Sequence, residues 1–301
     1  SVFIYIIVTS CNVFKTDGKE NNSVRKNNEQ RINFDIQKKD SYLISFYNAE
    51  NLFDTIDDPN TEDEEFTPTG YKKWTSERYK KKLKDISFVL SELDKDILPS
   101  IIGLCEVENE YVCEALTEEA LLTKAGYKVI HEESPDTRGI DVALLYNPNE
   151  FEYYSHSSIE VRIDKAPGAK LRDILYVKGA FHKSDTFHIF VNHWKSRRPS
   201  VKETEFKRIE TARILRYEID KIQERNKNAY IIVMGDFNDE PDNSSLKKVL
   251  TNSHKDGYTK LINLMIEADD KGEGTNSRDY KWFMLDNMIV SFSLTDGNEY
   301  D

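Results

Sequence analysis

Residues 230–238 have the sequence YIIVMGDFN, in which five consecutive apolar residues lead into a Gly-Asp-Phe-Asn turn. An unbroken apolar run of this length is typical of a strand covered on both faces at the centre of a sheet. Asp236 and Asn238 follow the strand directly, where a rigid scaffold commonly presents functional groups. The same two residues could instead cap a turn and have only a structural role. Residues elsewhere in the chain are needed to distinguish the two interpretations.

Polar residues adjoin four other expected strands in the same way. Loops at the ends of strands gather at one edge of a core, so we expect these residues to lie together. Carboxylate and amide oxygens are ligands of the kind that Mg²⁺ takes, with Mn²⁺ as a possible substitute. A histidine among them can exchange a proton near neutral pH. The residues are Asn48 and Glu50, Glu106, Asn192 and His193, and Asp286.

Other catalytic patterns are missing from the sequence. There is no HExxH zinc motif, no GxSxG nucleophile turn and no GxxxxGK[ST] phosphate loop. The three cysteines include no CxxC pair, so a disulfide framework is not expected. The formal net charge of −12 argues against capture of nucleic acid by charge alone. It does not argue against phosphate-ester hydrolysis, because bound cations invert the field at a carboxylate-lined site.

The periodicity predicts an α/β fold in which several strands follow one another without helices between them. Such an order favours two packed sheets flanked by helices over a doubly wound sheet. Amphipathic spacing predicts helices at 74–93, 110–124 and 201–224, with a short helix near 243–250. Strands are expected at 42–47, 101–105, 127–131, 140–146, 230–234 and 288–290, with three more between 151 and 192.

The first forty residues differ from the rest. Residues 1–11 form a short apolar run that ends in small residues and Cys11, like the tail of a lipoprotein signal peptide. The alternative is an ordinary buried strand with a core cysteine. Residues 12–40 are polar and predict a flexible tether. The folded domain is therefore expected at 41–301, with membrane attachment through a lipid on Cys11.

Five sequence blocks together resemble the endonuclease/exonuclease/phosphatase superfamily. They occur in its order and spacing over roughly 41–292, and the lipoprotein-like start resembles envelope members from Bacteroidetes-type bacteria. The resemblance implies a deoxyribonuclease I-like, four-layer α/β sandwich with two mainly antiparallel sheets flanked by helices. It also implies Mg²⁺-assisted attack of water on phosphorus. The blocks are Asn48-x-Glu50, Glu106, NHWKS at 192–196, GDFND at 235–239 and LDN at 285–287.

The resemblance assigns roles by position. Glu106 is the main metal ligand, Asp236 orients or deprotonates the attacking water, and His193 donates to the phosphate. Asn238 holds a phosphate oxygen. The remaining metal and phosphate shell consists of Asn48, Glu50 and Asp286, and substrate contacts are expected from Asn192, Lys195, Arg197 and Arg138.

Several polar residues carry a simpler interpretation. Arg138 could pair with Asp141 instead of contacting substrate. Arg208, on the third helix, is expected at the surface. His182 and His188 alternate within a strand region and are expected to be structural.

The family pattern ends in a Ser-Asp-His block that this sequence does not contain. The resemblance therefore implies either a fragment truncated at both ends or the loss of a catalytic group. In both cases we expect this polypeptide to be slower than a complete family member by about 10²–10⁴, the usual contribution of a general acid or base.

Three functions remain open. The first is an Mg²⁺-dependent phosphodiesterase or nuclease, monomeric and either lipid-anchored in the bacterial envelope or secreted. The second is a phosphatase or sphingomyelinase-like enzyme acting on a phosphorylated head group. The third is a catalytically silent binding lipoprotein.

Overall fold

A computed structural model describes residues 3–10, 41–181, 186–252 and 256–295, with side chains from residue 41 onward. Its strands are β1 (Phe3–Ser10), β2 (Ser41–Leu52), β3 (Ile101–Val107), β4 (Lys128–His131), β5 (Asp141–Tyr146), β6 (Phe151–Ile159), β7 (Ile174–Phe181), β8 (Phe187–His193), β9 (Tyr230–Asp236), β10 (Leu261–Asn263), β11 (Asn276–Arg278), β12 (Lys281–Phe283) and β13 (Asp286–Ser291). Its α-helices are α1 (Ser76–Ser91), α2 (Glu110–Thr117), α3 (Val201–Arg225) and α4 (Ile266–Asp270), and a π-helix covers Ser245–Leu250.

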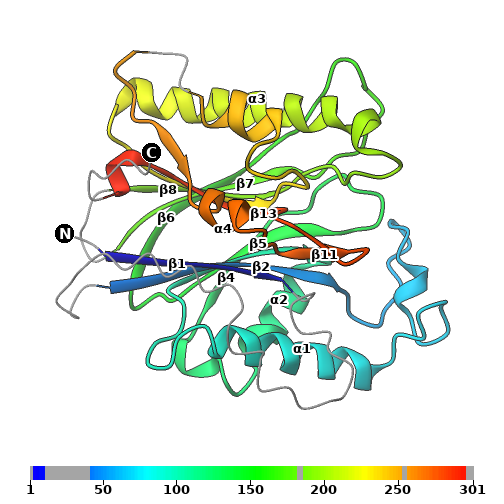
Figure 1. The fold of residues 1–301 in the computed structure, drawn as a ribbon. Helices are drawn as coiled ribbons and strands as arrows, with labels where there is room; N and C mark the ends of the chain where they lie inside the picture. The colour runs from blue at the N-terminus through cyan, green and yellow to red at the C-terminus, as the bar shows by residue number, and fades with distance from the viewer. Residues whose placement is uncertain (1–2, 11–40, 182–185, 253–255, 296–301) are drawn as a thin grey trace.

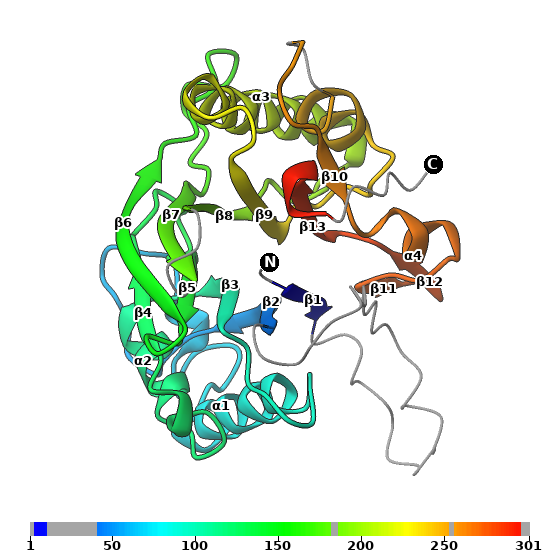
Figure 2. The same ribbon diagram turned by 90° about the vertical axis from the view of Figure 1, so that its left-hand side faces the viewer.

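Most strands belong to two sheets that face each other (Figures 1 and 2). One sheet has the order β1-β2-β3-β5-β4, and the other has the order β10-β13-β9-β8-β7-β6. Six of the nine neighbouring strand pairs in these sheets are antiparallel, and the parallel ones are β1/β2, β2/β3 and β8/β9. The expected mainly antiparallel, two-sheet architecture is therefore confirmed.

Three hydrophobic clusters lie between four layers. Phe46, Val177 and Met234 belong to the cluster between the two sheets. A second cluster packs α1 and α2 against the first sheet. A third packs α3 against the second sheet, on the opposite side of the molecule (Figure 1). Each sheet is thus covered on both faces, which explains why its central strands are apolar throughout.

The predicted elements are found with small changes at their ends. The helix expected at 110–124 ends at Thr117, and a 3-10 turn at Thr123–Ala125 with Gly126 at φ 63° completes the connection. The short helix near 243–250 has π geometry. Strand β2 runs through Asn48 and Glu50, so these two residues lie within the strand and not after it.

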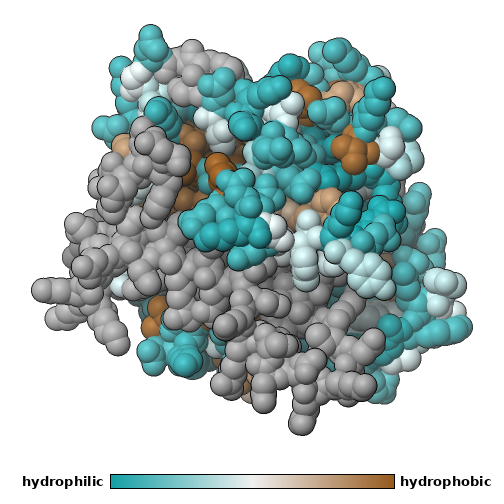
Figure 3. Space-filling view, viewed as in Figure 1, coloured by the Kyte–Doolittle hydropathy of each residue, from teal (hydrophilic) through white to brown (hydrophobic). Residues whose placement is uncertain are grey.

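The amino-terminal segment contributes one strand. β1 pairs in parallel with β2, Phe3 opposite Ser41 and Ser10 opposite Asn48. Cys11 and the tether at 12–40 lie outside the described residues, as does His182, so the lipid on Cys11 stays a prediction. Among the described residues, no helix has the length and apolar character needed to cross a membrane. The face of the molecule in Figure 3 is mostly hydrophilic where its residues are described.

Candidate active site

The site forms where two parallel strand pairs, one from each sheet, end side by side. In the second sheet, β8 and β9 place His193 opposite Asp236. In the first sheet, β2 and β3 place Asn48 opposite Cys105, the residue before Glu106. Parallel strands bring their carboxyl ends to the same edge, which is why polar residues far apart in the sequence meet here.

The contacts between the sheets are direct. Asn48 Nδ2 donates to Asp236 Oδ2 at 3.2 Å and to Glu106 Oε1 at 3.4 Å. His193 Nε2 lies 3.8 Å from both of these carboxylate oxygens. Asp286 begins β13 opposite Asp236, next to the same group. Four of the five sequence blocks therefore contribute residues that touch one another, and Asp286 adjoins them.

Three residues at this edge have strained backbone conformations. Glu50, Glu106 and Asn238 have φ values of 49°, 57° and 51°, a left-handed region that residues other than glycine rarely adopt. The β2/β3 ladder also shifts register between Asn48 and Leu52. Such strained residues cost about 1–3 kcal/mol each and cluster at functional sites. The strain redirects these side chains at the points where the strands leave the regular ladder.

Gly235 is required by the close approach of β8 and β9. A Cβ atom at this position would lie 2.3 Å from Asn192 O and 2.7 Å from Asn192 Cβ. Any side chain here would separate the two strands that carry His193 and Asp236. The glycine of the GDFN turn is therefore a packing requirement of the site.

Burial shifts the protonation of the central groups. Together with the nearby Glu106 carboxylate, it raises the pKa of Asp236 to about 7. Burial and the Asp236 carboxylate hold the pKa of Asp286 well above its usual value. Burial, with Arg172 nearby, holds the pKa of His193 well below its usual value. These shifts favour a neutral imidazole on His193 and protonated carboxyl groups on Asp236 and Asp286, whose protons a bound cation would displace.

The donor set fits a divalent metal ion. Glu106, Asp236 and His193 each offer a ligand atom, and these atoms lie within 4.8 Å of one another. His193 Nδ1 is buried without a hydrogen-bond partner in the described part of the chain. Carboxylates forced together by burial repel each other, and a bound cation would neutralise them. Mg²⁺ and Mn²⁺ both match carboxylate-rich sites.

Asn48 and Asn238 make hydrogen bonds within the site. Asn48 presents its NH₂ group to the carboxylates, while its oxygen accepts the Glu50 backbone N–H at 2.8 Å. That oxygen closes the bend at Glu50, and the NH₂ group bridges Glu106 and Asp236. Asn238 donates its backbone N–H to Asp236 Oδ1 at 2.8 Å and its side-chain NH₂ to Trp194 O at 3.2 Å.

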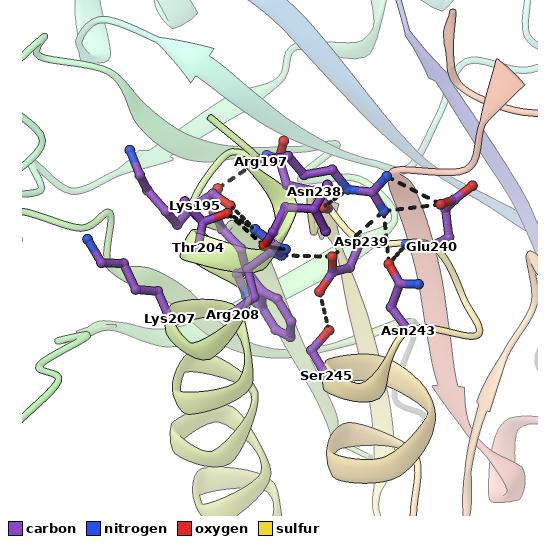
Figure 4. Close-up of polar contacts among 12 residues, drawn as sticks. Lys195, Arg197, Thr204, Lys207, Arg208, Asn238, Asp239, Glu240, Asn243 and Ser245 are labelled. Carbon is purple, nitrogen blue, oxygen red and sulfur yellow. Dashed lines mark hydrogen bonds and ion pairs between the residues drawn. The ribbon is translucent and has the colours of Figure 1, made fainter. Parts of the chain in front are cut away.

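Two of the predicted substrate contacts are used inside the fold. Asn192 is fully buried; its NH₂ donates to Met234 O and its oxygen accepts Trp194 Nε1. Arg197 donates from Nε to Asn238 O at 2.7 Å and pairs with Glu240 at 3.2 Å (Figure 4). Both residues fix the loops after β8 and β9.

The expectation of a surface position for Arg208 is wrong. Its side chain is fully buried, and Nε pairs with Asp239 Oδ1 at 2.7 Å while Ser245 donates to the other oxygen at 2.6 Å (Figure 4). Thr204 accepts from Arg208 Nη1 at 2.8 Å. This buried pair fastens the start of α3 to the loop that carries Asp236 and Asn238.

Arg172 is a supporting residue that the sequence patterns did not reveal. It lies just before β7, and its buried guanidinium donates to His193 O at 2.9 Å and to Trp194 O at 2.6 Å. Asp136 pairs with it at 2.5 Å. The arginine adjoins no motif, and its partners are 36 and 21 residues away. The only signal in the sequence is the predicted functional role of residues 192–196, which suggests that some side chain holds this loop in place.

Two basic side chains remain beside the site. Arg138 pairs with Asp136 at 3.2 Å and not with Asp141, and its side chain is half exposed. Burial lowers the pKa of Lys195, and the positive charges of Arg172, Lys207 and Arg138 act in the same direction. Lys195 and Lys207 extend away from the ion pairs around Asp239 (Figure 4). Positive charge therefore gathers beside the carboxylates of an otherwise acidic protein.

Comparison with known proteins agrees with this geometry. The model of the Endonuclease/Exonuclease/phosphatase family matches residues 43–301. Protein angel from Drosophila melanogaster is 25% identical over 217 residues, and the alignment covers 67% of this chain. The same alignment spans only 56% of Protein angel, little more than half the length of that curated relative.

Solved structures share the fold. The human Nocturnin catalytic domain is 21% identical, with a TM-score of 0.51, over 69% of this chain and 74% of that one. The mannosyl-6-phosphatase Bt3783 of Bacteroides thetaiotaomicron is 16% identical, with a TM-score of 0.54, over 82% and 84% of the two chains. The chain belongs to the endonuclease/exonuclease/phosphatase family, and its fold is of the deoxyribonuclease I type.

Proposed function

We propose that the protein is an Mg²⁺-dependent hydrolase of phosphate esters, with phosphodiesters as its substrates. The observation that carries this proposal is the convergence of Glu106, Asp236 and His193 within 4.8 Å, bridged by Asn48. The description of the matched family, Endonuclease/Exonuclease/phosphatase, supports the same reaction class. The Nocturnin domain was solved with a bound sulfate anion, a tetrahedral oxyanion like phosphate.

Each residue has a task in this proposal. Glu106 and Asp286 hold the cation, together with Glu50, and a bound Mg²⁺ would neutralise charge that develops on the phosphoryl group. Asp236, ionised once a cation is bound, would accept a proton from the attacking water. His193, kept neutral by burial, donates a hydrogen bond from Nε2 to a phosphate oxygen.

The basic side chains beside the site favour a phosphodiester substrate over a phosphomonoester with a small neutral leaving group. Besides burial, the positive charges of Arg172, Lys207 and Arg138 lower the pKa of Lys195, so all three lie near that lysine. A second phosphate or an extended polyanion would contact them, whereas a sugar leaving group would not need them. A phosphatase acting on a head group is the second candidate, because the mannosyl-6-phosphatase shares the fold over 82% of this chain.

A substrate panel tests the proposal. Protein purified from the native host and the 301-residue chain are each incubated with Mg²⁺ and one substrate at a time. The substrates are plasmid DNA, RNA, inositol phosphates, a sugar phosphate and sphingomyelin. We expect one of the phosphodiesters to be hydrolysed, and Asp236→Asn to slow that reaction by about 10²–10⁴. Asp270→Asn, an exposed carboxylate on α4, is the control. Hydrolysis that is equally fast in Asp236→Asn would contradict the assignment.

We also propose envelope attachment through a lipid on Cys11, motivated by the apolar run and small residues before it. Mass spectrometry of protein purified from the native host tests this separately. A diacylated cysteine at the mature amino terminus is the expected result. An unmodified Cys11 within a longer mature chain would overturn it.

A further inference from the structure

A second cluster of ligand atoms lies at the connection between β4 and β5. His131 ends β4, Glu133 follows it, and Asp141 begins β5. One ring nitrogen and one oxygen from each carboxylate lie within 4.8 Å of one another. None of these three residues belongs to the site formed by Glu106, His193 and Asp236.

Two polar atoms of this cluster are buried without a hydrogen-bond partner. His131 Nε2 and Asp141 Oδ2 face each other at 3.4 Å, with side-chain exposures of 4% and 1%. In the part of the chain that the structure describes, neither atom makes a hydrogen bond. Asp141 Oδ1 accepts the Ser134 backbone N–H at 2.9 Å, which fixes the carboxylate and leaves Oδ2 aimed at the imidazole. Buried polar atoms of this kind are costly unless something binds them.

Glu133 completes the cluster from the solvent side. The residue is exposed, so an ion has a path to the site. Two neighbouring carboxylates repel each other when both are charged, and a cation between them removes that repulsion. Ser134 Oγ, on the residue held by Asp141, is also buried without a partner.

We propose that His131, Glu133 and Asp141 bind a zinc ion. One imidazole nitrogen and two carboxylate oxygens are established zinc ligands, and three protein ligands leave a fourth position for water or Ser134 Oγ. Mg²⁺ favours all-oxygen sites, whereas imidazole favours zinc and similar transition metals. Metal binding thus satisfies both orphaned atoms at once.

The ion holds a loop that supports the active site. The connection between β4 and β5 carries Asp136, which pairs with Arg172, and Arg172 in turn holds the backbone of His193 and Trp194. Arg138 lies on the same connection. A zinc ion at its base fixes both ends of the loop, at His131 and at Asp141. Its role is structural, so the proposal stands whether or not phosphodiesters are the substrates.

Zinc counting tests the proposal. Equilibrium dialysis against Zn²⁺ in excess Mg²⁺, followed by elemental analysis, is carried out in a Glu106→Gln background to weaken zinc binding at the active site. We expect one zinc ion per chain in Glu106→Gln. Adding Glu133→Gln should weaken zinc binding by at least about tenfold, since even outer-shell changes cost about 10–100-fold. Adding Glu132→Gln, an exposed neighbour paired with His156, should leave binding unchanged.

A thermal readout separates binding from misfolding. Zn²⁺ should raise the unfolding temperature of Glu106→Gln and of the double variant with Glu132→Gln. It should not raise the unfolding temperature of the double variant with Glu133→Gln. Because Glu133 is exposed, its substitution leaves the core intact. Zinc bound equally well without Glu133, or no zinc bound in Glu106→Gln, overturns the proposal.

Discussion

Replacing Arg208 with methionine tests the buried pair that holds the active-site loop. The substitution keeps most of the side-chain volume and removes the guanidinium. Asp239, 1% exposed, would lose its 2.7 Å partner. It would keep the Ser245 hydroxyl at 2.6 Å and a more distant Arg197 nitrogen at 3.7 Å. Thr204 Oγ1 would also lose the donor it accepts from.

The expected cost follows from what remains around Asp239. Breaking a buried pair by removing one partner costs about 3–5 kcal/mol, because the other charge is left uncompensated. The two remaining contacts place Arg208→Met near the lower end, at about 3 kcal/mol. For a domain of this size, 1 kcal/mol shifts the unfolding temperature by about 2–4 °C, so the expected decrease is roughly 6–12 °C.

Urea unfolding followed by circular dichroism measures this free energy. Arg213→Met is the matched control, since Arg213 lies on the same helix with a 59% exposed side chain paired to Glu210. Its expected effect is below about 0.5 kcal/mol. The double variant Arg208→Met with Asp239→Asn should be less destabilised than the sum of the single changes, by about 1 kcal/mol or more. A loss below about 1 kcal/mol in Arg208→Met, or additive single effects, would show that the pair does not hold the loop.

Two further predictions concern β8 and its neighbours. Gly235→Ala should destabilise the protein by about 1–3 kcal/mol or more and reduce activity, because the new Cβ meets Asn192 O at 2.3 Å; Gly168→Ala, with open space around it, should do neither. Burial, with Lys178 nearby, lowers the pKa of His188 to about 4, so the unfolded chain binds more protons between about pH 4 and 6.5. The free energy of unfolding should therefore fall as the pH drops through that window, by about 1–2 kcal/mol after allowance for partial exposure. In urea titrations, His188→Gln should lose this pH dependence, and an unchanged pH profile in that variant would refute the prediction.

The layered fold was predictable because its signals are local and repeated. The apolar run before Gly235 and the consecutive strands between 151 and 192 each indicate covered sheets, and the structure contains both. The set of residues at the sheet edge was also predictable, because Glu106, His193 and Asp236 each adjoin an apolar strand. Their shared position at the ends of strands predicts that these three residues lie together.

Side-chain orientation was harder to predict. A buried arginine on an amphipathic helix has the same spacing as an exposed one, and the partner of Arg208 is 31 positions further along the chain, at Asp239. Whether Asn192 faces substrate or the fold depends on the β8/β9 register, which places it against Gly235. Arg172 adjoins no motif at all. Each of these depends on tertiary neighbours that no local pattern encodes.

Hydrolysis of a chromogenic phosphodiester as a function of Mg²⁺ concentration tests the central claim most directly. The account predicts that the rate depends on Mg²⁺ and falls in Glu106→Gln by at least about 100-fold, beyond the 10–100-fold cost of outer-shell changes. Glu110→Gln, an exposed glutamate at the start of α2, should keep the full rate. Hydrolysis that proceeds without a divalent metal, or that survives Glu106→Gln unchanged, would contradict it.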